Sequence, residues 1–149
     1  MRGLLTGASV VLAAQVVSSC AAGPGPEQVT RDVKRLETRL DQPVEVRVGV
    51  TVEVGGEPIT ITFERVTEDS RCPTGVNCVW AGDATVRLRA EAPQADRAAL
   101  DLHTHVSKAR EADYRGYRIR LVQLVPWPKE GSTPSPDQYV ATIVVSRGR

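Results

Sequence analysis

The sequence is poor in aromatic residues, in net charge and in long apolar segments. Aromatic side chains make up only 4% of the chain, so valine, leucine and isoleucine must supply most of any core. The formal net charge is +1 and no basic run occurs, which removes the electrostatic footprint of a nucleic-acid-binding protein. We therefore expect no nucleic-acid partner. The 41% hydrophobic share of these 149 residues is that of one ordinary globular domain.

A catalytic constellation is also absent from the sequence. Ser70 precedes Arg71 instead of lying in a glycine-flanked elbow, and nothing places a histidine on it. Glu68 and Asp69 are adjacent and would point to opposite faces of an extended chain, which makes them poor partners in acid–base catalysis. The sequence therefore predicts a protein that is not an enzyme and has no cofactor.

The N-terminus carries a pattern for export. Arg2 precedes an apolar stretch that is too short to predict a membrane span, and small residues follow. The segment Val17-Ser18-Ser19-Cys20 resembles a bacterial lipobox, in which the cysteine is lipidated and becomes the N-terminus after cleavage. We predict a lipoprotein signal peptide over residues 1–19 and a lipidated Cys20. An ordinary secretory signal with an incidental cysteine is the alternative.

The residues after Cys20 divide into a tether and one domain. Residues 21–28, AAGPGPEQ, have the glycine- and proline-rich composition of a flexible tether. We predict that residues 20–28 are this lipidated tether and that residues 29–149 form a single β domain. The lipid at Cys20 would hold the domain on a membrane of the bacterial cell envelope, facing the periplasm or the exterior.

Two cysteines remain once Cys20 is lipidated. Cys72 and Cys78 form an even pair for an oxidising compartment, and the intervening PTGVN has the composition of a tight turn. The pair predicts a structural disulfide. Metal or redox chemistry fits less well, because the spacing is C-x5-C and no second ligand pair is nearby. Free thiols are the third alternative.

Alternating hydrophobicity runs through most of the remaining chain. Val44 to Val54 has a valine at every second position and predicts one half-buried strand. Gly55-Gly56 predicts a hairpin turn, and a bulge is expected near Arg65-Val66, where the alternation of the return strand slips. Further strands are predicted around residues 59–64, 84–91, 98–102, 117–121 and 139–145. The last of these is apolar on both faces, as in a central strand.

These segments predict an all-β fold. We expect an antiparallel β-sandwich with Ig-like organisation, six to seven strands and one disulfide, with a small β-barrel as the alternative. The one helical candidate is residues 29–40, where apolar residues recur at helical spacing. Leu36, Thr38 and Leu40 would suit a strand equally, so helix and strand both remain open there.

One group of residues is a candidate metal site. Asp101, His103 and His105 are alternate residues, so on one strand they would share its outward face and could bind Cu or Zn. They include the only two histidines of the chain, so no third imidazole can complete the site. An exposed polar strand face explains the three residues equally well.

The stretch DSRCPTGVNCVWAG, residues 69–82, holds most of the candidate contact residues. Asp69 can accept backbone N–H bonds from the following turn, and Arg71 can pair with Asp69 or with Asp83. Trp80 is predicted to pack beside the disulfide as part of the core. Structural roles are favoured for these side chains over contact with a ligand or partner.

Trp127 lies between two prolines in the loop PWPKEGSTPSPD, residues 126–137. The prolines stiffen this segment and keep it out of a central sheet position. Trp127 is predicted to fold back as a lid over the end of the sandwich. The alternative is an exposed aromatic side chain that binds a partner.

The run DSRCPTGVNCVWAGDATVRL resembles the signature of a family of uncharacterised bacterial lipoproteins. Its matching positions are Asp69 to Pro73, then Cys78, and Trp80 to Gly82. The later GYRIRLVQLVPWP and QYVATIVV are similar to the C-terminal strands and proline-flanked aromatic loop of that family. The resemblance implies an exported β domain and implies no activity.

The sequence thus predicts a non-enzymatic, lipid-anchored module of the cell envelope with a binding or structural role. Its partners would be the membrane, through Cys20, and an envelope protein or glycan. The alternative function is a periplasmic metal-binding protein that uses His103 and His105.

Overall fold

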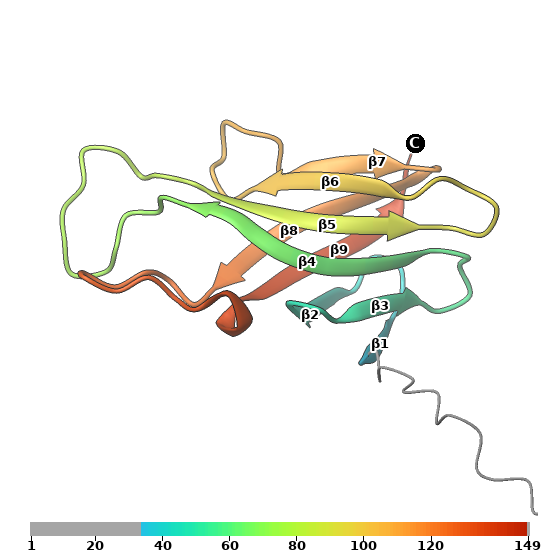
Figure 1. The fold of residues 1–149 in the computed structure, drawn as a ribbon. Helices are drawn as coiled ribbons and strands as arrows, with labels where there is room; N and C mark the ends of the chain where they lie inside the picture. Colours follow the sequence, from blue (N-terminus) through green and yellow to red (C-terminus); the bar gives the residue numbers. More distant parts are fainter. Residues whose placement is uncertain (1–33, 149) are drawn as a thin grey trace, which may run out of the picture. The chain divides into compact units, whose positions relative to one another are not determined.

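The computed structural model describes residues 34–148, and these form nine β-strands and one short 3-10 helix (Figure 1). The predicted signal peptide, Cys20 and the tether lie outside the described residues. No helix in the described part of the chain is long and apolar enough to cross a membrane. The elements are β1 (Arg35–Thr38), β2 (Pro43–Arg47), β3 (Thr51–Val54), β4 (Thr60–Asp69), β5 (Ala84–Glu91), β6 (Ala98–His103), β7 (Glu111–Tyr114), β8 (Tyr117–Val125), η1 (Pro136–Gln138) and β9 (Val140–Arg147).

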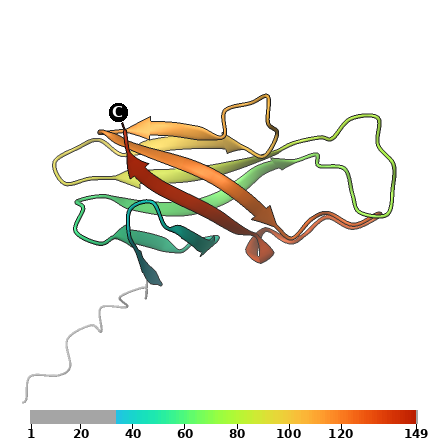
Figure 2. The same cartoon turned by 180° about the vertical axis from the view of Figure 1, so that it is seen from behind.

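The strands form two open sheets. One has the order β1-β3-β4-β5-β6 and the other the order β2-β9-β8-β7, and Figures 1 and 2 show them as two layers seen from opposite sides. All neighbouring strands are antiparallel except β1 and β3, which are parallel. The all-β sandwich is therefore confirmed and the closed barrel is not formed.

The core lies between the sheets and is built mainly from aliphatic residues at alternate strand positions. On β5 these are Ala84, Val86, Leu88 and Ala90, all without solvent exposure. On β9, Ala141, Ile143 and Val145 are equally buried, and β9 lies between β2 and β8, as expected for a central strand. Burial of such side chains at about 25 cal/mol per Å² is the main force that holds the sheets together.

The segment from Val44 to Val54 is two strands instead of the one predicted. The chain turns at Gly49, whose φ of +80° suits glycine, so that β2 pairs with β9 while β3 pairs with β4 in the other sheet. Val46 and Val52 are both fully buried, so the valine pattern continues across the turn. Alternation reports which face a residue occupies, not the sheet to which its strand belongs.

This division helps to raise the number of strands in the described residues from the six to seven expected to nine. At the start of the described chain, Arg35–Thr38 is strand β1, which excludes the helix alternative there. The predicted bulge is confirmed, because the pairing of β4 with β5 shifts register between Phe63 and Arg65 and again between Val66 and Glu68.

Candidate functional site

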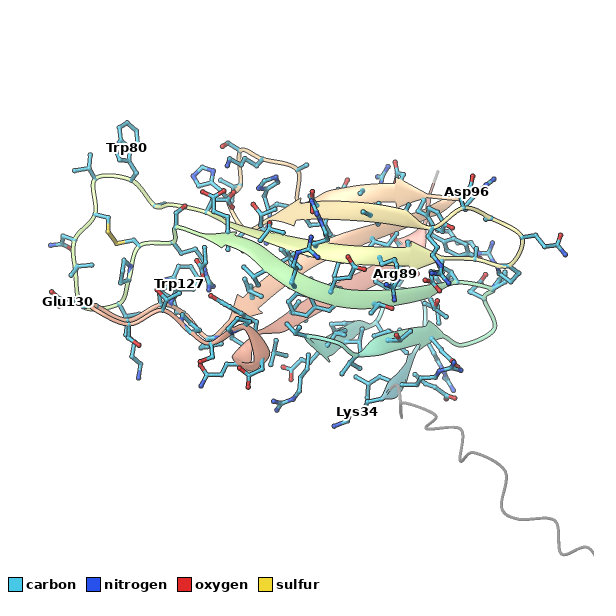
Figure 3. The ribbon with its side chains drawn as sticks, viewed as in Figure 1. Lys34, Trp80, Arg89, Asp96, Trp127 and Glu130 are labelled. Carbon is cyan, nitrogen blue, oxygen red and sulfur yellow. A yellow bond between two sulfur atoms is a disulfide. The ribbon has the colours of Figure 1, made fainter. Side chains whose placement is uncertain are left out.

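The stretch that carries the sequence motif forms a loop at one end of the sandwich. It leaves the sheet at the end of β4, Asp69, and returns to it at the start of β5, Ala84. Figure 3 shows this loop projecting beyond the strands, with the disulfide across it. Cys72 and Cys78 are bonded, with their Cα atoms 5.9 Å apart, so the predicted disulfide is confirmed.

Arg71 connects the base of this loop to both sheets. The residue is 3% exposed, and its guanidinium donates in a fork to Asp69, with Nε–Oδ1 of 2.8 Å and Nη2–Oδ2 of 2.6 Å. It also donates to two carbonyl oxygens, that of Leu124 in β8 at 2.7 Å and that of Pro126, just after the strand, at 2.8 Å. Of the two partners that the sequence left open, Arg71 therefore pairs with Asp69 and not with Asp83. This arrangement satisfies a buried charge by both charge pairing and hydrogen bonding.

Asp69 is the acceptor at the centre of the same cluster. Its Oδ1 accepts the backbone N–H of Arg71 at 3.2 Å, as predicted for a residue that caps a turn, and its Oδ2 accepts the Tyr139 hydroxyl at 2.9 Å. Burial alone would raise the pKa of Asp69, but the hydrogen bonds from Arg71 and Tyr139 outweigh burial and lower it. Burial and the bond to Asp69 raise the pKa of Tyr139 to about 12. The cluster is thus held as a carboxylate with a neutral phenol.

Trp127 covers this cluster from the opposite loop. Its ring lies over the Arg71 guanidinium, 4.6 Å from ring centroid to Cζ, and its Nε1–H donates to the carbonyl oxygen of Cys72 at 2.6 Å. The loops are joined further by the N–H of Thr74, which donates to the Pro128 carbonyl at 2.9 Å. Trp127 therefore folds back as predicted, yet 47% of the residue is exposed, so the side chain is also accessible to a partner.

Trp80 does not pack beside the disulfide, and that prediction is wrong. It is 82% exposed and its neighbour Val79 is 90% exposed, and Figure 3 shows Trp80 pointing away from the loop. The prediction assumed an extended chain after Cys78, in which residues two apart share a side. The chain bends at Val79-Trp80 instead and belongs to no strand there.

Asp83 is an organising residue that the sequence analysis considered only as a partner for Arg71. Its Oδ1 accepts the backbone N–H groups of Thr104 at 3.0 Å and His105 at 2.9 Å, and its Oδ2 accepts from His103 at 2.7 Å and Lys108 at 3.0 Å. Burial would raise the pKa of Asp83, but these bonds together hold it far below its usual range. The β6–β7 turn is thereby attached to the start of β5. The donors lie some 20 positions away in sequence, so no local pattern indicated them.

The candidate metal residues engage three different partners. Asp101 pairs with Arg87 across the sheet, at 2.6 Å between Oδ2 and Nη2, while His103 contacts Asp83. His105 lies beyond the end of β6, in the turn, where its Nδ1 is 2.7 Å from the Ser107 hydroxyl. The prediction that all three share one strand face is therefore wrong at His105. Within residues 34–148 no group of three or more His, Cys, Asp or Glu side chains is placed to hold a metal ion.

The site is thus a disulfide-closed loop on an all-β sandwich, fastened at its base and apolar at its apex. Comparison with known proteins adds no relative: no family model, no curated protein and no solved structure matches the chain.

Proposed function

We propose that this protein is a non-enzymatic, lipid-anchored binding module of the cell envelope, and that it contacts an envelope protein or glycan through the apex Val79-Trp80. The observation that carries the proposal is the exposure of these two apolar side chains on a fastened loop. Large exposed aromatic residues on rigid elements supply much of the binding energy at interfaces.

The loop has the composition of an interface centre. No charged residue occurs between Cys72 and Gly82, and depletion of charge is a feature that distinguishes the core of an interface from other surface. The apex is also held in place before any partner arrives. The disulfide closes the loop, the buried Arg71 fixes its base, and Thr74 bonds it to Pro128. A preorganised apex loses little conformational entropy on binding.

The polar groups of the motif are engaged within the fold, which supports a binding role over a catalytic one. Both carboxylate oxygens of Asp69 accept hydrogen bonds, and the Ser70 hydroxyl donates to the Asp83 carbonyl oxygen at 3.1 Å. The Ser70 hydroxyl therefore donates to the backbone. Nucleophilic catalysis would need it to donate to a general base instead.

Lys34 and the apex lie at different places on the domain. The carbonyl oxygen of Lys34 accepts the N–H of Thr51 at 3.2 Å, and Thr51 pairs with Thr62 on β4. Thr62 is roughly 23 Å along β4 from its end at Asp69, at about 3.3 Å per residue. A domain held through its N-terminus would thus keep the apex free for a second partner.

Site-specific crosslinking in intact cells tests the proposal. A photo-crosslinking amino acid is placed at Trp80 in the exported full-length chain and, as a matched control, at Arg120, an exposed position on β8. We expect a discrete adduct from position 80 that position 120 does not give. Trp80→Ala should reduce capture of the same partner by a crosslinker at position 79.

The same variant separates binding from folding. Because Trp80 is exposed, Trp80→Ala should change the free energy of unfolding by no more than about 0.5 kcal/mol. Identical adducts from positions 80 and 120, or none from position 80, would count against the apex as a contact surface.

A further inference from the structure

A groove of about 330 Å³ lies beside the loop, between it and the β6–β7 turn. Ala81 and Gly82 line one side, residues 104–106 and Arg110 line another, and residues 121–124 of β8 and Trp127 complete it. This volume is within the range of small-molecule sites. The groove is distinct from the apex, because neither Val79 nor Trp80 lines it.

The walls of the groove expose apolar side chains. Val106 is 79% exposed, and Val122 and Trp127 are also exposed to solvent. Trp127 is held by the Arg71 guanidinium on its ring and by its own bond to Cys72, so this wall is formed in advance. An apolar group of a ligand would gain by covering these side chains.

The groove also has a positive charge without a counterion. Its lining, drawn from residues 34–148, contains no Asp or Glu. Of its two arginines, Arg71 is neutralised by Asp69, whereas Arg110 forms no ion pair with any described residue. The neighbouring Lys108 is paired with Asp83. Arg110 is therefore the charge that an anionic ligand would meet.

The guanidinium of Arg110 is fixed in position by the backbone of β8. Its Nη2 donates to the carbonyl oxygens of Val122 at 2.9 Å and Leu121 at 3.4 Å. Its Nη1 has no hydrogen-bond partner among the described residues; its Nε has none either, but it is buried and out of reach of a ligand. A fixed guanidinium whose Nη1 is unused is suited to a carboxylate, which accepts charge-assisted hydrogen bonds from it.

We infer that this groove binds a small carboxylate that carries an apolar group, with the carboxylate on Arg110 and the apolar group against Val106, Val122 and Trp127. The inference rests on the proposed function as a binding module and names the chemistry of one ligand. The free C-terminus of a peptide with an apolar last residue has this chemistry, and so does a fatty acyl carboxylate.

Two pairs of probes test the inference on the purified, exported chain. N-acetyl-leucine represents a peptide end and hexanoate an acyl chain, and each is compared with its uncharged amide. Binding is followed by NMR through the indole N–H signal of Trp127, which Trp80→Phe assigns because the chain has only two tryptophans. At least one acid should shift this signal saturably, and its amide should bind at least about 10-fold more weakly. The preferred acid identifies the source of the ligand.

Variants assign the carboxylate to Arg110. Arg110→Gln keeps a donor for the Val122 carbonyl and should lower the affinity for the acid at least about 10-fold. The control Arg120→Gln on β8 should leave that affinity unchanged. Val106→Glu places a negative charge, like that of the probe's carboxylate, on the exposed rim of the groove, where folding is insensitive to it. It should lower the affinity for the acid but not for the amide.

Equal binding of acid and amide, full binding by Arg110→Gln, or no binding of either acid would overturn the inference. If neither acid binds while the crosslink at Trp80 persists, the ligand class is wrong and the proposed function stands. If an acid binds and the crosslink is absent, the groove stands and the apex is not the contact surface.

Discussion

Arg71 has the largest set of contacts of any side chain in the motif, and it carries them while buried. Its replacement by methionine would leave the Asp69 carboxylate buried with only Tyr139 and a backbone N–H as donors. Breaking one side of a buried ion pair costs about 3–5 kcal/mol, so Arg71→Met should lower the free energy of unfolding by about that much. Urea denaturation measures the loss. The control Arg120→Met removes an exposed arginine and should cost no more than about 0.5 kcal/mol.

Two glycines of the loop allow backbone strain to be separated from steric conflict. Gly82 has a φ of +70°, and a Cβ there would fall on the backbone carbonyl of Ser70. Gly75 has a φ of +96° but no atom within 4 Å of its Cβ position. Gly75→Ala should therefore cost about 1–2 kcal/mol from its left-handed backbone alone. Gly82→Ala should lower the free energy of unfolding clearly more, because the backbone at Ser70, just after β4, must also move. Equal thermal-unfolding losses for the two variants would contradict this account.

The residue-level predictions that named a specific partner succeeded where that partner was near in the chain. The Asp69 cap spans two residues and the disulfide spans six, and both were predictable from local composition. The prediction for Trp80 was wrong for a related reason. The direction of its side chain depends on whether the backbone after Cys78 is extended or bent. The carbonyl partners of Arg71 lie more than 50 residues away, and no sequence pattern indicates them.

At the level of elements, the β6–β7 turn depends on a single carboxylate, Asp83. Its pKa is lowered in the folded protein, so it stabilises the fold above its unfolded pKa of about 3.9, and that stability is lost as pH falls toward the folded value. Asp69 acts in the same direction. The urea midpoint should therefore fall as pH is lowered below about 4.

Asp83→Asn tests this dependence on the same turn. It should lower the free energy of unfolding near neutral pH by about 2 kcal/mol and flatten the acid-dependent loss, since the ionised acceptor is gone. Glu45→Gln, which removes an exposed carboxylate of β2, is the matched control. A variant profile parallel to that of the wild type from pH 2 to 7 would show that Asp83 is not the group responsible.

The strands themselves were largely predictable, and their pairing was not. Period-two alternation identified the buried face of β5, and a segment apolar on both faces indicated the central position of β9, because burial acts on each residue separately. The parallel pairing of β1 with β3 and the separation of β2 from β3 depend on contacts between distant segments. A single turn at Gly49 moves the chain from one sheet to the other without disturbing the valine pattern.

At the scale of the whole molecule, the proposed function depends on where three features lie on the domain: Lys34, the apex and the groove. Lys34 lies beside the start of β3, the apolar apex lies on the loop after β4, and the groove opens beside that loop. None of these positions follows from composition. Lys34 and the apex lie apart because β4 runs from the neighbourhood of Lys34 to the base of the loop, and the groove forms where the loop faces the β6–β7 turn and β8.

The predicted anchor determines whether this arrangement operates at a membrane, and mass spectrometry of the exported protein tests it. If the lipobox is used, the mature chain begins at Cys20, carries a lipid and partitions into the detergent phase of a detergent–water separation, because buried acyl CH₂ groups contribute about 0.8 kcal/mol each to membrane affinity. Cys20→Ser should carry no lipid and should not be cut before residue 20. The double variant Cys72→Ser/Cys78→Ser removes the other two cysteines and should still be lipidated. A wild-type chain without lipid that begins at another residue would indicate an ordinary secretory signal, and the domain would then be a secreted module.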